Sequence, residues 1–402
     1  MKKTKLIAPG MLIFVLSLSL SCSKIEFKKM ESPAYLRVFN NLRFKLTVEN
    51  KEQSLSVLTM LIDPVFDTEG LPVSAATTGD FLITRDTYAP PYPSHIGNSV
   101  DVFNPEYPGK EKVMAAPILN GYDLSSWAQV PSGQKRVLFY FRPKSQVPFF
   151  NLEARFRTSP VIDTVLSLEE KEVYTLNVLQ KDFETKKNGL LLRKEVFHKL
   201  PLADSLVYVN FYNMSAKGYV EAPSAYKPSP IYYHSDMAQG VRNEMKVYYT
   251  LSEKKGSYQW NNPLQSHDRV YMTTMKRNTE SPETSTYYHF PLFAKQNGKV
   301  VESSLYQFFY FLAPGYDINQ VPWGAYSTGN DGRYTFLTCY LNGKVDPSEG
   351  SAQIGTLIPN LIATTHSGEH NPRSFGTVNT IEIVNGDAYL TTVQRVFAPP
   401  TY

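Results

Sequence analysis

The chain has 402 residues, of which 42% are hydrophobic and 19% are charged, so it can form two domains with cores and is too apolar for wholesale disorder. Its 41 basic and 37 acidic residues give a formal charge of +4. Three of the lysines lie within the first five residues, which leaves 38 basic against 37 acidic residues, a net of +1, in the remainder. This balance gives no reason to expect a nucleic-acid partner.

Residues 1–21 have the order of a secretory signal peptide. A lysine-rich start is followed by the apolar run Leu6–Leu20, and the small residue Ser21 stands immediately before Cys22. The run is shorter than the roughly 20 residues that a transmembrane helix needs, and no later uncharged window reaches that length. We therefore expect a removable leader and no membrane-spanning segment.

Cys22 resembles the lipidation cysteine of bacterial lipoproteins. There the thiol is diacylated and the new amino terminus is usually acylated, and several acyl chains anchor a protein stably. Leu is typical three residues before that cysteine, but this chain has Ser19 there, so an ordinary secretory signal stays open as an alternative. The resemblance implies lipidation at Cys22, a lipidated tether over 22–33, and a place at the outer membrane or cell surface, with the leaflet left open.

The rest of the chain consists of short β-rich runs separated by turn signals, and convincing amphipathic helices are scarce. Asn-Gly pairs, which are strong hairpin signals, occur five times, and two short stretches, 123–128 and 360–365, are the best helical candidates. This pattern predicts an all-β fold of β-sandwiches. The strands are expected at 42–48, 137–141, 161–168, 173–179, 206–212, 247–251, 270–275, 287–293, 305–312, 334–341, 378–384 and 388–396.

An internal repeat divides the chain into two parts. The run Leu36–Leu42 lines up with Tyr208–Met214, since each has an aromatic residue followed two positions later by Asn and a large aliphatic residue. Each copy opens a new series of strands. We therefore predict two consecutive Ig- or transthyretin-like sandwich domains over 34–199 and 200–402.

The junction of these two parts resembles an uncharacterised β-sandwich family that occurs, often in tandem, in lipoproteins of Bacteroidota. The residues that carry the resemblance are Val173–Leu176 and Val207–Met214, with the Leu36–Leu42 copy as support, and they cover about a third of the chain. The resemblance implies a surface lipoprotein of unknown domain function, and it brings no catalytic residues with it.

The sequence contains weak candidates for metal or catalytic sites. His366–His370 fits the H-x-x-E-H pattern of inverted zinc peptidases, but Gly368 and Pro372 make a helix unfavourable, so a polar loop is expected. The acidic stretch Asp63–Glu69 could donate oxygens to calcium, yet its spacing differs from an EF-hand loop, so a solvated turn is preferred. A buried, inert thiol is expected for Cys339. We predict no catalytic residues, no metal and no cofactor.

Aromatic loops are the remaining candidates for a binding site. One loop combines Tyr316, Trp323 and Tyr326 with Gly, Pro and amide side chains, and Trp260 lies in a similar stretch. A flat ring with a polar edge suits stacking on a sugar, while Asn or Asp can bond the hydroxyls. The alternative is that these rings anchor the loops on the sandwich edge.

The sequence favours a non-enzymatic, lipid-anchored surface protein that binds a ligand, with a glycan expected and nutrient capture as its role. A second outer-membrane protein is a possible partner. A structural subunit of fimbriae or adhesins is the first alternative, and it would require a first strand that can be cut away at an Arg such as Arg37 or Arg43. An envelope hydrolase is the second alternative. The ligand, the partners and the oligomeric state are not given by the sequence.

Overall fold

The computed structural model describes residues 30–42, 57–83, 85, 92, 114–143, 147–203, 206–223, 226–227, 241–255, 259–282, 284–291, 295–296, 299–300, 305–320, 334–340, 356–359, 365–366, 372–373 and 377–395. All the strands that the structure describes lie within one compact unit, Ser32–Tyr402. In the described ranges the regular structure is strand and short 3-10 helix, which confirms the all-β prediction. No helix within those ranges has the length and hydropathy of a membrane span.

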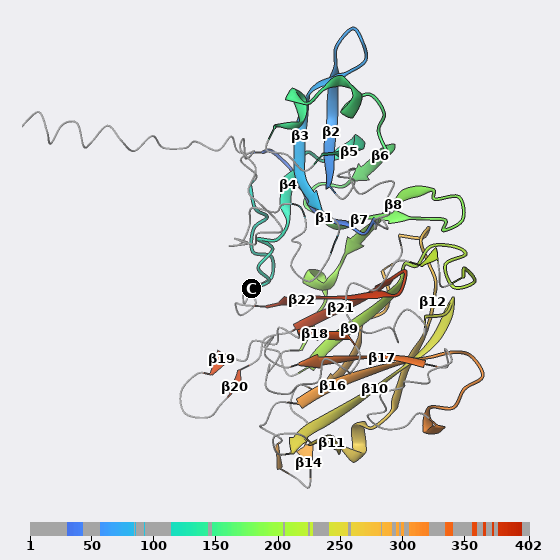
Figure 1. Ribbon diagram of the computed structural model, residues 1–402. Coiled ribbons are helices and arrows are strands. Elements are labelled where there is room, and N and C mark those ends of the chain that lie inside the picture. The colour runs from blue at the N-terminus through green and yellow to red at the C-terminus, as the bar shows by residue number, and fades with distance from the viewer. Residues whose placement is uncertain are drawn as a thin grey trace, which may run out of the picture. The chain divides into compact units, whose positions relative to one another are not determined.

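The first sandwich is built from two four-stranded sheets (Figure 1). Apolar side chains that alternate along the strands fill the space between the two sheets, among them Val38, Met60, Phe139 and Leu176. One sheet has the order β3 (Pro72–Ile83), β2 (Val57–Phe66), β5 (Gly133–Arg142), β6 (Ile162–Leu168). The other has the order β4 (Ala128–Val130), β1 (Ala34–Asn40), β7 (Val173–Gln180), β8 (Asn188–Glu195).

The second sandwich pairs a four-stranded sheet with a six-stranded one. Its core contains Val209, Val247, Phe309 and Ile381. The four-stranded sheet has the order β13 (Tyr288–Pro291), β9 (Leu206–Asn213), β21 (Thr377–Val384), β22 (Asp387–Gln394). The six-stranded sheet has the order β11 (Gln259–Pro263), β10 (Glu244–Lys255), β16 (Leu305–Leu312), β17 (Tyr334–Tyr340), β18 (Thr356–Pro359), and β12 (Val270–Lys276) also pairs with β10.

Short elements complete the described structure. Two-stranded ladders join β14 (Lys295–Gln296) to β15 (Lys299–Val300) and β19 (Thr365–His366) to β20 (Pro372–Arg373). The 3-10 helices are η1 (Phe149–Asn151), η2 (Ala154–Phe156), η3 (Phe197–Lys199), η5 (Gln265–His267) and η6 (Ile318–Gln320).

The repeat seen in the sequence is a repeat of topology. β1 pairs in parallel with β7, which forms a hairpin with β8, and β9 pairs in parallel with β21, which forms a hairpin with β22. The sequence alignment is one residue out of register, however. It matches Asn41 with Asn213, but Asn40 is the equivalent residue, because Asn40 and Asn213 each accept a hydrogen bond from the N–H two residues later. A slip by one residue would exchange the two faces of the strand.

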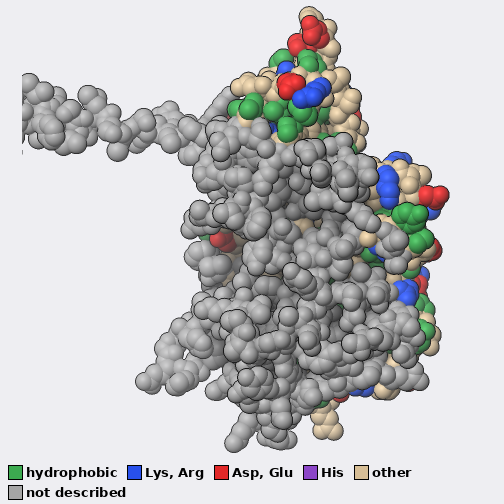
Figure 2. Space-filling view, in the orientation of Figure 1, with side chains coloured by type: hydrophobic (Ala, Val, Ile, Leu, Met, Phe, Trp, Pro, Cys, Tyr) green, Lys and Arg blue, Asp and Glu red, His purple; other side chains and the backbone are tan. Residues whose placement is uncertain are grey.

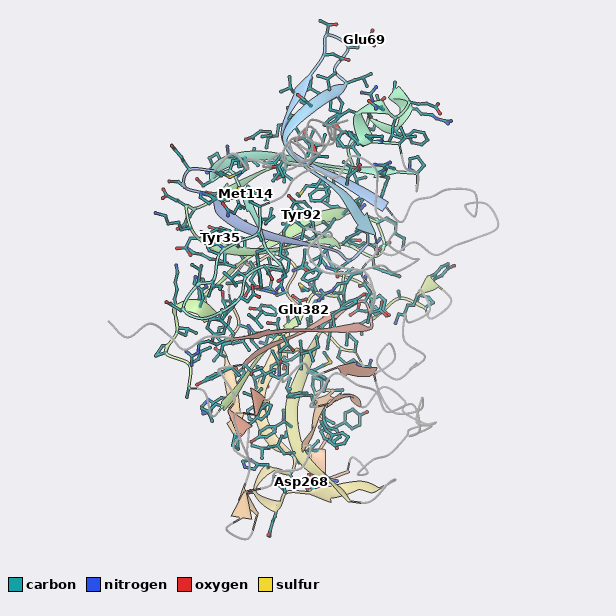
Figure 3. All side chains as sticks on the ribbon, turned by 90° about the vertical axis from the view of Figure 1, so that its left-hand side faces the viewer. Tyr35, Glu69, Tyr92, Met114, Asp268 and Glu382 are labelled. Atoms are coloured by element: carbon teal, nitrogen blue, oxygen red, sulfur yellow. The ribbon has the colours of Figure 1, made fainter. Side chains whose placement is uncertain are left out.

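The inner sheets of the two sandwiches pack against each other, and we call this contact the inter-sheet joint. Apolar clusters combine Tyr35 and Trp127 of the first sandwich with Tyr208 of the second, and Leu179 with Tyr389. Between these apolar patches lie buried charged side chains, among which Glu382 of β21 is central (Figure 3). The predicted domain boundary near residue 200 stays a prediction, because contacts across the joint are extensive.

The hairpin of β2 and β3 was not among the predicted strands. Its sequence contains Asp63, Pro64 and an acidic turn, which favoured a loop. Pairing between β2 and β5 ends at Ile62, so the missing N–H of Pro64 leaves no β5 partner unpaired. β2 therefore continues as a two-stranded arm with β3 as far as Phe66.

The Asn-Gly signals had mixed outcomes. Asn385 and Gly386 form the predicted hairpin turn, both with positive φ, as do Asn120 and Gly121 in a tight turn. The turn predicted at 188–189 was wrong, because both residues lie in β8 and the turn precedes them. The helical candidate at 123–128 was also wrong, because the segment is a turn that leads into β4. Of the candidate at 360–365, residues 360–364 lie outside the described residues and Thr365 begins β19.

The described surface carries mixed charges. Basic and acidic side chains are interspersed with apolar ones on the described part of the face in Figure 2. Exposed pairs such as Arg136 with Asp163, whose nitrogen and oxygen lie 2.7 Å apart, contribute to this pattern. Such pairs add little stability because water and salt screen them.

Candidate functional site

The predicted binding residues fall on or beside the six-stranded sheet, but the structure does not gather them into one cluster. The backbone of Trp260 belongs to β11, which pairs with the Ser252–Lys255 end of β10. Tyr316 follows β16 at the opposite end of β10 and is 42% exposed. Trp323 and Tyr326 lie outside the described residues, as does the lipidation candidate Cys22.

A row of tyrosines crosses the outer face of this sheet between those two ends. Tyr271 of β12 pairs with Tyr248 of β10, which pairs in turn with Tyr310 of β16. The neighbouring residues Val247 and Tyr249 lie in the sandwich core, so the alternation of the strand turns Tyr248 outward. We call these three residues the tyrosine row; adjacent strands lie about 4.8 Å apart, so the row spans roughly 10 Å.

Exposure increases along the tyrosine row toward the edge of the sheet. Tyr310 is buried, Tyr248 is half-buried, and Tyr271 is 52% exposed. The rings of Tyr248 and Tyr271 meet edge to face with centroids 5.5 Å apart. The Tyr271 hydroxyl lies 2.9 Å from Thr274 Oγ1, which fixes the orientation of the ring. The edge of the sheet thus presents a fixed aromatic surface with a polar rim.

A polar corner borders the tyrosine row. Thr250 Oγ1 donates to Asp268 Oδ1 at 3.0 Å and accepts the backbone N–H of Arg269 at 2.9 Å. Arg269 has a φ of 53°, which is uncommon for a residue with a side chain. The corner holds the carboxylate of Asp268, three residues before Tyr271, and Arg269, two residues before it, so residues with hydrogen-bonding groups flank the aromatic surface.

The sequence did not single out Tyr271. The run Val270–Met275 was expected as a strand, but its order of Val, Tyr, Met, Thr, Thr and Met lacks a strict alternation that would show which residues face outward. A β-bulge opposite Val247 and Tyr248 shifts the register, and only the strand pairing shows that Tyr271 shares a face with Tyr248.

The second notable group of polar side chains lies in the inter-sheet joint. Glu382 accepts a hydrogen bond from Arg85 at 2.5 Å and one from Arg193 at 2.8 Å. Arg193 also donates through two nitrogens to one oxygen of Glu195, at 3.1 and 3.0 Å. Arg37 stacks over Trp127, with its guanidinium carbon 3.9 Å from the ring centre. All four charged groups of the bonded network and Arg37 are buried.

The electrostatics of the joint follow from burial and pairing. Burial alone would raise the pKa of Glu382, but Arg85 and Arg193 lower it to about 2. Burial lowers the pKa of Arg37 to about 10, although Glu195 and Glu382 act against this shift. These groups are therefore charged at neutral pH and hold the two inner sheets together as an ion network, a structural role.

The metal-site candidates have structural explanations. Asp63 accepts hydrogen bonds from Lys135 and from the Arg136 backbone, and Asp67 caps its own hairpin turn by accepting the N–H groups of Glu69 and Leu71. His366 pairs with Pro372 in a two-residue ladder, and 367–371 are outside the described residues. In the described part of the chain no three His, Cys, Asp or Glu residues are placed to hold a metal ion.

Comparisons with known proteins add little. No family model and no curated protein matches the chain. Among solved structures the chain is similar to the C-terminal fragment of the pilus adhesin SpaC from Lactobacillus rhamnosus GG, at 11% identity over 89% of this chain and 95% of that one. The TM-score is 0.10, so this likeness supports no inference about fold or function.

Proposed function

We propose that this protein is a non-enzymatic, lipid-anchored surface protein of the outer membrane that binds a glycan through the tyrosine row of its C-terminal sandwich. The observation that carries the proposal is the half-exposed Tyr271, oriented by Tyr248 and Thr274 on a rigid sheet. The membrane anchor through Cys22 and a role in nutrient capture are parts of the same proposal and rest on the leader sequence.

The chemistry of the site suits a sugar ring. An aromatic face offers apolar contact to the C–H groups of a pyranose, and the polar groups beside it can bond hydroxyls. Asp268 and Arg269 supply an acceptor and donors on one side of the row, and Lys246, which is exposed, lies on the other side between Thr274 and Leu312 in the strand register. Because the sheet fixes these positions before binding, little ordering cost opposes association.

The fimbrial alternative loses one of its supports. Cleavage at Arg37 would require a protease to reach a residue that is buried at the centre of its sheet, with β4 and β7 on either side. Arg37 is also bonded to Thr175 at 3.2 Å, so the folded chain does not offer this bond for cutting. Arg43, the second candidate, lies outside the described residues.

A glycan array tests the proposal with residues 23–402, which include the whole compact unit Ser32–Tyr402. We expect saturable binding to at least one glycan class. Tyr271→Ala should weaken that binding about tenfold or more, since central aromatic contacts dominate such interfaces. Tyr316→Ala and Trp260→Ala then show how far the site extends toward each end of β10.

Tyr226 provides the matched control. It is 69% exposed, and no residue of the tyrosine row is its neighbour in sequence or strand register. Tyr226→Ala should leave glycan binding unchanged while removing a ring that is more exposed than that of Tyr271. An array without signal from a folded protein, or an equal loss in both variants, would refute the site.

A further inference from the structure

Arg37 presents a charge that the fold buries without a counter-ion. Its side chain is only 6% exposed, in the middle of β1, and forms no ion pair in the described part of the chain. Its one side-chain hydrogen bond goes to the hydroxyl of Thr175. Its Nε is buried with no hydrogen-bond partner. A buried charge is costly unless it is paired, so this guanidinium requires a partner.

The carboxylates of the joint are already engaged elsewhere. Glu382 uses one oxygen for Arg85 and the other for Arg193, and Glu195 is bonded through two nitrogens of Arg193. Among the described residues, three buried arginines therefore accompany two buried glutamates in this network, an excess of one positive charge, and Arg37 is the arginine that neither carboxylate bonds. In a low-dielectric interior the electrostatic cost of that excess charge is larger than in water.

Further buried donors without partners occur in the same joint. The amide Nδ2 of Asn177, two residues along β7 from Thr175, has none, and neither has the hydroxyl of Tyr287. Tyr287 packs against the cluster that contains Trp127, and Arg37 stacks on the Trp127 ring, so the two lie in one neighbourhood. Arg37 itself lies between Tyr35, which packs with Tyr208 of the facing sheet, and Phe39, on which Arg85 stacks.

We propose that a small monovalent anion of halide size binds at Arg37 within the inter-sheet joint, accepting the Nε–H of Arg37 and neighbouring donors. The anion neutralises the excess charge of the network and satisfies donors that the protein leaves unpaired. Because it lies where the two sandwiches meet, its binding stabilises their association, independently of whether the outer face binds a glycan.

Thermal unfolding in bromide against gluconate at constant ionic strength tests the proposal. At bromide concentrations above the dissociation constant of the site, each tenfold rise in concentration should raise the Tm of the wild-type chain by about 2 °C. Arg37→Met should abolish this dependence. Arg155→Met, which removes an exposed guanidinium, is the matched control and should keep it.

Anomalous diffraction from bromide-grown crystals supplies a measurement that needs no variant. A peak within hydrogen-bond distance of Arg37 Nε supports the proposal. An ordered water or no density there, an equal response in bromide and gluconate, or a response that survives Arg37→Met would overturn it. Should Arg37→Met fail to fold, the anomalous peak alone decides.

Discussion

The two inner sheets share one strand order and yet carry different side chains where they meet. In the register that makes Tyr35 equivalent to Tyr208, Leu36 matches Val209 and Leu179 matches Val384. These positions keep their apolar character, because they fill the sandwich cores or the apolar part of the joint. The charged positions do not repeat.

Arg37 is equivalent to Asn210 in this register, and Asn177 is equivalent to Glu382. A sheet that packs on a copy of itself would bring like charges together, which costs free energy in a buried contact. The two copies have therefore diverged at the face where they meet, with the cations mostly on the first sheet and Glu382 on the second. The complementary charges indicate that the two inner sheets pack on each other in one defined arrangement.

The largest expected effect is the loss of the charge on Glu382. Glu382→Gln leaves Arg85 and Arg193 buried without their shared carboxylate, so we expect a loss of about 3 to 5 kcal/mol in the free energy of unfolding. Denaturant unfolding measures it. Glu153→Gln, which breaks an exposed pair with Arg155, is the control and should change nothing measurable. An unaltered midpoint for Glu382→Gln would mean that the network does not hold the joint.

Acid should release the same network. The pKa of Glu382 lies at about 2 in the folded chain and near its ordinary 4.5 in the unfolded one, so its contribution is complete above about 4.5 and is lost as the pH falls toward 2. The shift corresponds to about 3 kcal/mol. Unfolding free energies measured between pH 6 and 2 test this, and Glu382→Gln should flatten the profile. An identical slope in wild type and variant would contradict it.

A second pH effect, at a higher pH, belongs to the connection between the two sandwiches. Burial lowers the pKa of His198 in η3 to about 4. The unfolded chain then takes up this proton first, near pH 6.5, so stability falls as the pH drops from 6.5 to 4, by up to about 3 kcal/mol. His198→Gln should remove the slope in this window and leave the Glu382 window below it intact. Wild-type stability that stays flat from pH 7 to 4.5 would disprove the assignment.

The smallest expected effect tests the register of the repeat. Asn40→Ala and Asn213→Ala each remove an acceptor for the N–H two residues later, at 3.0 and 3.2 Å. Each should cost about 1 kcal/mol, and the two losses should add, because the residues lie in different sheets. Chemical denaturation of both single variants and the double variant measures this. A large loss at one position and none at the other would break the equivalence.

Much of the fold was predictable from local pattern. Strands such as β7, β16 and β21 combine β-branched and aromatic residues with turn signals on either side, and they lie within one or two residues of the expected ranges. β2 was missed because Pro64 and its acidic neighbours are typical of loops, and the sequence does not show where the pairing with β5 ends.

The candidate site was predictable only in part. An abundance of aromatic residues pointed to the C-terminal sandwich, and Tyr316 is exposed, whereas its role in binding stays a prediction. The tyrosine row depends on the pairing of β12, β10 and β16, which are separated by up to 60 residues in the chain, so no local pattern reveals it. The burial of Arg37 was equally hidden from the sequence. Arg37 alternates with the apolar residues Leu36 and Val38, and this pattern alone suggests that its side chain faces solvent.

The all-β class, the existence of the repeat and about half of the described strands follow from the sequence, because alternation, composition and turn residues within short windows indicate them. Which strands are buried on both faces became clear only from the tertiary structure. Leu36 packs into the core of the first sandwich and Arg37 lies on the opposite face of β1, which is also buried, and only the stacking of the sheets makes both sides of β1 interior. Burial on both faces is a property of packing between distant segments, and for this reason the charge network of the joint could not be predicted from a local pattern.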